Sequence, residues 1–303
     1  MLGIIIANWN GEKLIDKCLK SLNEQTFKDF KIYIIDNDSK DNSNKIINYY
    51  KSKLNIELTN LDHNSGFAKA NNIGIKQAIR DKCDYILTLN NDVELTKNCL
   101  ENAVNNIKED KDNDIFQLFM VNYYDRNKCD AVGLLFDEKL IPIQLGLKQN
   151  VEKIMKSEVN IEGVCAGAAI YSSKCLEKVK LDENNYFDSN FFAYYEDVDL
   201  ALRLKNAGFK STLLKDSIVY HMHSATGNKT SGFKEYYLAR NLFLYTKRNQ
   251  PLDKFNKLKF HYYIIILKSI IKNITNMKVI KSILKGLRDS KKEILKIEYK
   301  KID

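Results

Sequence analysis

This chain lacks several features that would assign a protein class at once. Its six cysteines lie singly, with no CxxC pair and no histidine at finger spacing, which argues against zinc fingers and disulfide frameworks and favours buried, reduced thiols. Neither GxGxxG nor GxxxxGK[ST] occurs, which disfavours Rossmann dehydrogenases and P-loop NTPases. Only 2 prolines are present, and no internal repeat or low-complexity linker interrupts the chain.

Long hydrophobic runs are absent as well. The longest, YYIIIL at residues 262–267, is far below the roughly 18 to 20 residues that span a bilayer. No basic stretch followed by an apolar segment marks a signal peptide at the N-terminus, so we expect a cytosolic chain. With 44% hydrophobic residues among 303, the chain has enough apolar material for a real core, in one large domain or two modest ones.

The net charge of +9 belongs to the C-terminal tail alone. Residues 251–303 contain 14 Lys/Arg and 5 Asp/Glu, whereas residues 1–250 contain 34 of each. A basic tail serves nucleic acid, an anionic membrane or only solubility. Because no aromatic-basic RNA-binding signature accompanies it, we expect no nucleic-acid partner.

Strand-like and helix-like segments alternate in the first hundred residues. The strand-like runs are LGIIIA (2–7), KIYIID (31–36), NIELTNL (55–61) and DYILTL (84–89). This alternation predicts an α/β fold, with a mostly parallel central sheet flanked by helices. Further along, the pattern indicates a buried strand at 164–173, a helix at 197–209 and a returning strand at 211–221.

Polar or small residues follow each of the four early strands. They are Ala7-Asn8-Trp9-Asn10-Gly11, Asp36-Asn37-Asp38-Ser39, Asp62-His63-Asn64-Ser65-Gly66 and Asn90-Asn91-Asp92. Each segment alone is typical of an ordinary turn. Parallel α/β sheets, however, bind ligands beyond the carboxyl ends of their strands, so the agreement of four tips predicts one shared site. Without a phosphate loop, a diphosphate there would need a divalent cation, and Asp92 is a suitable ligand.

Six ordered motifs between residues 2 and 249 give the chain a family resemblance. They are IIIANWNGEKLIDKCLKSLNEQTF, IIDNDSKDNS, HNSGFAKANNIGI, LNNDVEL, FFAYYEDVDLALRLKNAGF and VYHMHSATG. In this order they resemble a family 2 glycosyltransferase of the GT-A fold, and most of all its bacterial rhamnosyltransferase-like branch. The resemblance divides the chain into a GT-A domain at 1–250 and a basic, amphipathic, helical tail at 251–303.

The resemblance implies roles for the strand tips. Asn8, Asn10 and Asp36 would bind the nucleoside, and a carboxylate such as Asp36 suits a base N3–H. Asn64, Gly66 and Asn72 would line the nucleotide cleft. The alternative for each is structural: a capping turn at Asp36, and an ordinary loop and solvated helix start around Asn72.

The implied metal site departs from the family's Asp-x-Asp pattern. Asn90 and Asn91 stand where acids are common, so Asp92 is the sole carboxylate, and His221 matches the family's late metal-binding histidine. His223 is the weaker candidate. One carboxylate is a weak cage for Mg²⁺ or Mn²⁺, so diphosphate oxygens, water and a further ligand must complete the shell.

The YYEDVDLALR segment carries the implied reaction. Inversion at an anomeric carbon needs a base for the acceptor hydroxyl, and the second acid of the Glu-Asp pair, Asp197, fills that role in the family. Glu196 would contact the acceptor. The competing interpretation is that Asp197 and Asp199 only complement the dipole at a helix N-terminus. Arg240 and Asn241, in YYLARNLFLY, match a helical Arg-Asn pair of this branch, and Arg240 would meet either a phosphate or a surface acid.

These inferences predict an inverting glycosyltransferase. It would move a sugar from a UDP- or dTDP-linked donor to a glycan or lipid-linked glycan acceptor in cell-surface polysaccharide synthesis. The lysine-laced tail suits an anionic membrane surface, although such helices more often pack on their own domain. Two alternatives stay open: a degenerate nucleotide- or membrane-binding scaffold, and a GT-A-like nucleotidyltransferase, against which ANWNGEKL lacks a Gly-rich, Arg-bearing loop.

Overall fold

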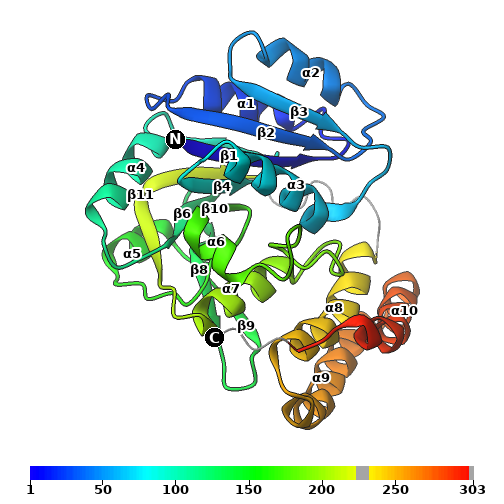
Figure 1. The fold of residues 1–303 in the computed structure, drawn as a ribbon. Helices are drawn as coiled ribbons and strands as arrows, with labels where there is room; N and C mark the ends of the chain where they lie inside the picture. Colours follow the sequence, from blue (N-terminus) through cyan, green and yellow to red (C-terminus); the bar gives the residue numbers. More distant parts are fainter. Residues whose placement is uncertain (223–231, 300–303) are drawn as a thin grey trace.

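A computed structural model of the chain describes residues 1–222 and 232–299 (Figure 1). Its strands are β1 (Leu2–Asn8), β2 (Phe30–Asp36), β3 (Ile56–Asn60), β4 (Tyr85–Leu89), β5 (Val93–Leu95), β6 (Ile115–Asn122), β7 (Cys129–Ala131), β8 (Gly133–Phe136), β9 (Pro142–Leu145), β10 (Ala168–Ser172) and β11 (Ser211–His221). Its α-helices are α1 (Ile15–Asn23), α2 (Ser43–Tyr50), α3 (Gly66–Arg80), α4 (Cys99–Glu109), α5 (Val151–Lys156), α6 (Ser173–Val179), α7 (Glu196–Asn206), α8 (Phe233–Asn249), α9 (Leu252–Lys272) and α10 (Met277–Glu293). The α/β prediction is confirmed, and the strands predicted at 2–7, 31–36, 55–61 and 84–89 are present as β1, β2, β3 and β4.

The central sheet has the order β3-β2-β1-β4-β10-β6-β11-β5, with β7 added beside β6. Strands β3, β2, β1 and β4 are parallel, and β10 runs antiparallel to both of its neighbours, β4 and β6. Strand β11 is parallel to β6, so it ends at the same edge as the first four strands. This topology places the end of β11 at the same edge as the strand tips that the sequence singles out. His221, the last residue of β11, is more than 120 residues beyond the end of β4 in the sequence.

Helices cover both faces of the sheet because the parallel strands are apolar on both sides. One core contains the buried residues of α1, α2 and α4. The other contains those of α3, α6 and α7. The central strand β6 was not anticipated, although its sequence IFQLFMVN is almost wholly buried. Its apolar run follows a polar loop at 110–114 and lacks the helix alternation that identified the earlier strands.

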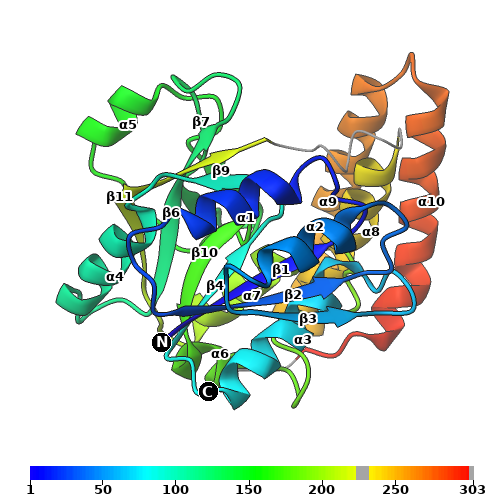
Figure 2. The same cartoon turned by 90° about the horizontal axis from the view of Figure 1, so that it is seen from above.

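The last three helices form a separate layer. Figures 1 and 2 show α8, α9 and α10 together on the side toward which the arrowheads of β2 and β3 point. Side chains of all three share one core, which also contacts Tyr195. Gly286 of α10 lies so near α8 that a Cβ there would be 2.3 Å from the carbonyl oxygen of Tyr236. The expected division at residue 250 falls between α8 and α9 and stays a prediction, because α8 packs with the tail helices.

Candidate functional site

The tips of β1, β2 and β4 are joined by a buried hydrogen-bond network. The amide of Asn91 donates to Asn8 Oδ1 at 2.8 Å, and Asn8 Nδ2 donates to Asp36 Oδ2 at 2.8 Å. All three side chains are buried. Asn91 is therefore more than a turn residue, because its amide connects the tip of β4 to the residues expected to bind the nucleoside.

The turn after β1 is fixed to the turn after β2. The backbone N–H of Asn10 donates to Ser39 Oγ at 2.8 Å, and Asn10 Oδ1 accepts from the backbone N–H of Lys40 at 2.8 Å. Asn10 has a φ of 48°, a left-handed conformation that asparagine tolerates better than most residues. The other oxygen of Asp36 accepts from the Ser39 backbone at 2.8 Å. These contacts pre-form the edge of the site.

Strand register brings Asp92 and His221 together. His221 is the last residue of β11 and pairs with Val93, the residue after Asp92, in the antiparallel ladder with β5. His221 Nε2 lies 3.1 Å from Asp92 Oδ1, and both side chains are buried. The two residues predicted to hold a metal thus meet directly, and His223 lies outside the described residues.

Asp130 supports this pair from behind. It lies in β7 at an irregularity of the ladder with β6, where Met120 pairs with Ala131 and Val121 with Cys129. Such bulges redirect a side chain, and Asp130 Oδ2 hydrogen-bonds His221 Nδ1. Burial lowers the pKa of His221, but hydrogen bonds and charge from Asp130 and Asp92 outweigh it and raise the pKa to about 10.

The arrangement fits a divalent cation with few protein ligands. His221 Nε2 and Asp92 Oδ1 lie 3.1 Å apart, and imidazole nitrogen and carboxylate oxygen are both donor atoms that could hold such a cation. A carboxylate on the far nitrogen of a ligating histidine, as Asp130 provides, is the usual support of such a ligand. The described residues contain no group of three or more His, Cys, Asp or Glu suited to a metal, so substrate oxygens and water would complete the shell.

Asp197 is linked to the same edge through the segment before β10. Its Oδ2 accepts from the Ala166 backbone at 3.4 Å, while the carbonyl of Gly167 accepts from the backbone of Asn90 at 2.9 Å. A segment of adjacent residues therefore contacts both Asp197 and the turn that carries Asp92. Asp197 is partly exposed, and burial raises its pKa despite the lowering effect of the Val198 and Ala166 N–H groups.

The structure separates the three acids at the start of α7. Asp199 is fully buried and pairs with Arg203 at 2.8 Å, and Arg203 also donates to the carbonyls of Val179 and Tyr186. Asp199 is thus a structural residue. Within residues 1–222 and 232–299, Asp197 has no cationic partner. An unpaired, partly exposed carboxylate with a raised pKa suits a base better than a helix cap.

Glu196→Gln is expected to remove a pH-dependent loss of stability. Burial and the neighbouring Asp197 raise the pKa of Glu196 well above 4.5, and its buried Oε2 has no hydrogen-bond partner in the described part of the chain. The folded chain then holds the proton of the Glu196 carboxyl more tightly than the unfolded chain does. The free energy of unfolding of the wild type therefore falls as pH rises above about 4.5. Thermal melts at increasing pH should show the wild type losing stability relative to the variant. Parallel curves for the two proteins would contradict this assignment.

The loop leading into Glu196 is strained and closely packed. Phe192, Tyr194 and Tyr195 have φ values of 66°, 65° and 75°, which cost energy for side chains of this size. The loop passes directly over the start of α3, where a Cβ on Gly66 would lie 2.5 Å from the Phe192 carbonyl oxygen. Asn64 Oδ1 accepts from the Gly66 backbone at 3.0 Å. Gly66 is required here by the approach of the loop.

Asn72 also serves this loop. Its Nδ2 donates to the Phe187 carbonyl at 2.7 Å, and its Oδ1 accepts from the backbone N–H groups of Phe187 and Tyr186 at 2.8 and 3.2 Å. Both ends of the amide are therefore engaged by backbone. This differs from the expectation that Asn72 lines the nucleotide cleft, because a fully bonded, buried amide has little left to offer a ligand.

Arg240 and Asn241 clamp the same loop from α8. Asn241 Nδ2 donates to the carbonyls of Phe191, Ala193 and Tyr194 at 3.0, 2.8 and 2.7 Å. Arg240 donates to the carbonyls of Asn190 and Phe191 at 2.6 and 2.7 Å, and its guanidinium lies over the Tyr237 ring. No ion pair joins Arg240 to an acid within the described residues, and its expected contact with a phosphate stays a prediction. The pair holds the strained backbone that precedes Glu196.

Asn241→Ala should loosen this loop. The change leaves the partly buried carbonyls of Ala193 and Tyr194 without this donor, while that of Phe191 keeps Arg240, and we expect a loss of roughly 2–4 kcal/mol in the free energy of unfolding. Because Glu196 and Asp197 follow the loop, turnover should fall about tenfold with a smaller change in donor affinity. Denaturant unfolding and steady-state kinetics measure both effects. Asn105→Ala, at an exposed position of α4, is the matched control. Equal stability and turnover of the two variants would contradict the proposed role of Asn241 in holding the loop.

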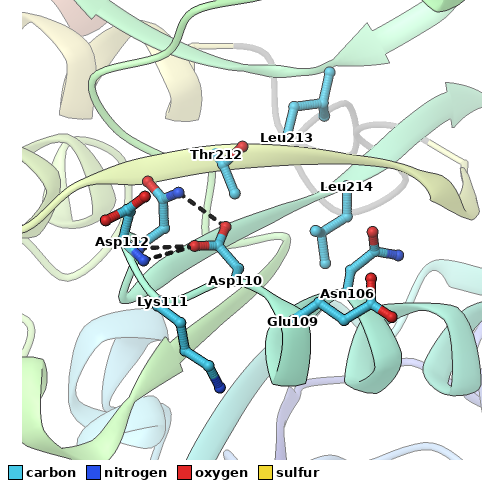
Figure 3. Close-up of a pocket in the computed structure, with 9 residues that line it drawn as sticks. Asn106, Glu109, Asp110, Lys111, Asp112, Thr212, Leu213 and Leu214 are labelled. Atoms are coloured by element: carbon cyan, nitrogen blue, oxygen red, sulfur yellow. Dashed lines mark hydrogen bonds between the residues drawn. The ribbon is translucent and has the colours of Figure 1, made fainter.

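A hollow of about 550 Å³ lies away from these residues. Figure 3 shows it between the end of α4 and the first part of β11, lined by Asn106, Glu109, Asp110, Lys111, Asp112, Asn113 and Thr212–Leu214. Leu214 and His221 are seven residues apart on one strand, or about 23 Å at 3.3 Å per residue. The hollow is therefore at the opposite edge of the sheet from the strand tips.

One contributor to the site, Asp130, was not predicted. It stands alone among apolar residues in CDAVGLLF, and a lone acid in such a run is the sequence signal that marks it. Asn241 was singled out with Arg240 as a helical Arg-Asn pair, but the sequence did not show which groups it contacts. Its three acceptors belong to a loop nearly 50 residues earlier.

Comparison with known proteins places the chain in a family. The model of glycosyl transferase family 2 matches residues 3–180, more than half of the chain. The poly(ribitol-phosphate) beta-N-acetylglucosaminyltransferase TarS of Staphylococcus aureus (strain MW2) is 32% identical over 109 residues, which are 35% of this chain and 18% of TarS. This chain thus spans a small part of the length of that relative.

Solved structures share the fold. The structure of S. aureus TarS 1–349 in complex with UDP-GlcNAc has a TM-score of 0.59 at 19% identity and covers 97% of this chain and 81% of its own. GalNAc-T7 with UDP, GalNAc and Mn²⁺ has a TM-score of 0.59 at 14% identity and covers 92% and 59%. These likenesses confirm the predicted GT-A architecture. With the match over residues 3–180, they establish that the chain belongs to glycosyl transferase family 2.

Proposed function

We propose that this protein is an inverting glycosyltransferase. It would transfer a sugar from a UDP- or dTDP-linked donor to a hydroxyl group of a cell-surface glycan precursor. The observation that carries the proposal is the convergence at one sheet edge of the Asp36–Asn8–Asn91 network, the Asp92–His221 pair and Asp197. Family membership supports the same reaction class.

Asp197 is the proposed catalytic base. The acceptor oxygen forms a bond to the anomeric carbon as the bond from that carbon to the diphosphate oxygen breaks, and the acceptor proton passes to the Asp197 carboxylate. A single displacement inverts the anomeric configuration. Glu196, which precedes the base, is proposed to contact the acceptor.

Asp92 and His221 would hold Mg²⁺ or Mn²⁺. When bound, such a cation neutralises charge on the donor diphosphate and on the departing nucleotide. Support comes from the 3.1 Å between the two ligand atoms, the backing of His221 by Asp130, and the Mn²⁺ named in the GalNAc-T7 structure. Because Asn90 and Asn91 stand where acids are common in the family, the assay with and without EDTA described below is needed to test whether activity requires the metal.

The nucleoside is proposed to bind at the turns after β1, β2 and β3. Asn8, Asn10 and Asp36 are held by hydrogen bonds at the first two turns, and Asn64 and Gly66 lie where the chain enters α3. Asn72 and Arg240 would act indirectly, by holding the loop before Glu196. The UDP-GlcNAc and UDP bound to TarS support a uridine donor.

The acceptor is proposed to be a glycan or a lipid-linked glycan. TarS acts on poly(ribitol-phosphate) according to its name, which supports an envelope polymer as the acceptor class. No helix among the described residues is long and apolar enough to cross a membrane. We propose a cytoplasmic enzyme that works peripherally at the inner face of the cell membrane.

A panel of sugar nucleotides tests the proposal. Purified protein is incubated with Mn²⁺ and each UDP- or dTDP-sugar, and nucleoside diphosphate release is measured with and without EDTA. One donor should give release that EDTA suppresses. Nucleotide binding in calorimetry without any release would favour a scaffold instead. Pyrophosphate release from a sugar phosphate and a nucleoside triphosphate would favour a nucleotidyltransferase.

A further inference from the structure

Helix α9 has two apolar faces, and the described residues cover only one of them. Phe255, Tyr262 and Ile266 are buried, and the last two belong to the core shared with α8 and α10. Figure 1 shows α9 at the lower margin of the molecule. The residues of the second face are Phe260, Ile264, Leu267 and Ile271, which we call the α9 stripe.

The α9 stripe is a continuous exposed surface. Its residues are spaced by four, three and four positions, which places them along one side of a helix. They are 73%, 36%, 55% and 58% exposed. Two more exposed apolar residues follow: Ile274, 68% exposed, in the turn after α9, and Met277, 60% exposed, at the first position of α10. Single exposed apolar residues are common, but an aligned row marks an interaction surface.

The segment of the chain that contains the stripe carries charge of one sign. No Asp or Glu occurs from residue 254 to residue 288, whereas that segment holds nine Lys/Arg. Lys257, Lys268 and Lys272 are exposed on α9, and none of them makes an ion pair within the described residues. Lys268 directly follows Leu267, and Lys272 directly follows Ile271, so positive charge borders the apolar row along its length.

We propose that the α9 stripe and its bordering lysines dock this protein on an anionic lipid bilayer. An interfacial helix inserts its apolar face at the boundary between headgroups and acyl chains, while its lysines reach acidic headgroups. Charge complementarity selects this occupant. A second copy would bring the same positive charge to the contact, and a soluble polyanion would leave the apolar row exposed.

Docking by α9 would also orient the candidate site. The core beneath α9 contacts Tyr195, the residue before Glu196, so the surface and the proposed base belong to one packed unit. A lipid-linked acceptor would then meet a site held at a fixed height above the bilayer. This consequence rests on the proposed function, whereas lipid binding itself does not and is measured without donor or metal.

Vesicle flotation of the full chain tests the proposal. Phosphatidylcholine vesicles, alone or with phosphatidylglycerol, are mixed with protein at low and high salt. Protein should float with the phosphatidylglycerol vesicles and dissociate at high salt. The Leu267→Gln/Ile271→Gln variant should lose flotation, and Lys268→Gln/Lys272→Gln should bind more weakly by about fivefold per lysine. Tyr124→Gln, at a position 76% exposed and far from α9 in the sequence, is the matched control and should bind as the wild type does.

Three results would overturn the proposal. The first is no flotation with phosphatidylglycerol vesicles. The second is a pair of observations: the apolar variant still floats with the vesicles, and inorganic polyphosphate abolishes its flotation. Charge alone would then explain the binding. The third is sedimentation without lipid that shows a dimer for the wild type and a monomer for the apolar variant. Because the replaced side chains are exposed, unchanged melting temperatures of the variants will show that a loss of binding is not a loss of folding.

Discussion

Asp197→Asn should lower sugar transfer by about three orders of magnitude while leaving donor binding nearly intact. Removing a positioned general base costs about 10²–10⁴-fold in rate. The substitution keeps the shape of the side chain, and burial already opposes the charge of Asp197 by raising its pKa, so the fold should tolerate it. Nucleoside diphosphate release in the presence of acceptor measures the rate, and calorimetry with donor measures binding.

The control for this experiment is another acid at an exposed position. Asp216 lies on β11 with an exposed side chain, and Asp216→Asn should retain full activity. Transfer by Asp197→Asn at the wild-type rate would remove Asp197 from the mechanism. Loss of donor binding together with activity would instead indicate that Asp197 supports the fold of the cleft.

Asp92→Asn and His221→Gln should each abolish metal-dependent nucleotide binding. Asp92 and His221 are the two proposed ligands within residues 1–222 and 232–299, so the loss of either removes half of the protein contacts proposed for the cation. Affinity for UDP in Mn²⁺ should fall to the level that the wild type shows in EDTA. Mn²⁺ affinity should fall by at least about 10²-fold, since loss of a supporting residue alone costs about 10–100-fold.

Asp130→Asn gives a graded comparison in the same assay. It retains both ligands and alters only the group behind His221, so Mn²⁺ affinity should fall by about 10–100-fold and residual binding should persist. Melting curves of all three variants are needed, because breaking a buried ion pair destabilises a fold by several kcal/mol. Unaltered Mn²⁺ binding in folded Asp92→Asn protein would show that the cation lies elsewhere.

Local sequence patterns were enough to predict the strands and the sheet edge at which most of the candidate site residues lie. The first four strands and β11 are apolar and β-branched, and parallel pairing sends their ends to one edge whatever the details of packing. That rule places Asn8, Asp36 and Asp92 at the edge, whereas the nucleoside-binding role of Asn8 and Asp36 comes from the family resemblance. The position of His221 at the tip of β11 was predicted from the family motif, and its register with Val93 explains the contact with Asp92.

Roles that depend on distant partners were not readable from residue type. Asn72 and Arg240 both belong to motifs and both carry groups that suit a nucleotide, yet their hydrogen bonds go to the loop before Glu196. The same holds for Asp199, which resembles Asp197 in sequence but is fully buried and is bound by Arg203 and Asn249. A side chain can serve ligand or backbone, and the neighbour that it meets decides which.

The sequence by itself determined the sheet, the edge at which chemistry gathers and the basic, helical character of the tail. These properties arise from periodicity and charge, which are local and additive along the chain. Tertiary structure alone decided that a bulge aims Asp130 at His221, that Asn241 clamps a strained loop, and that α9 leaves one apolar face uncovered. Each of these depends on which distant surfaces meet, and that is settled only when the whole chain packs.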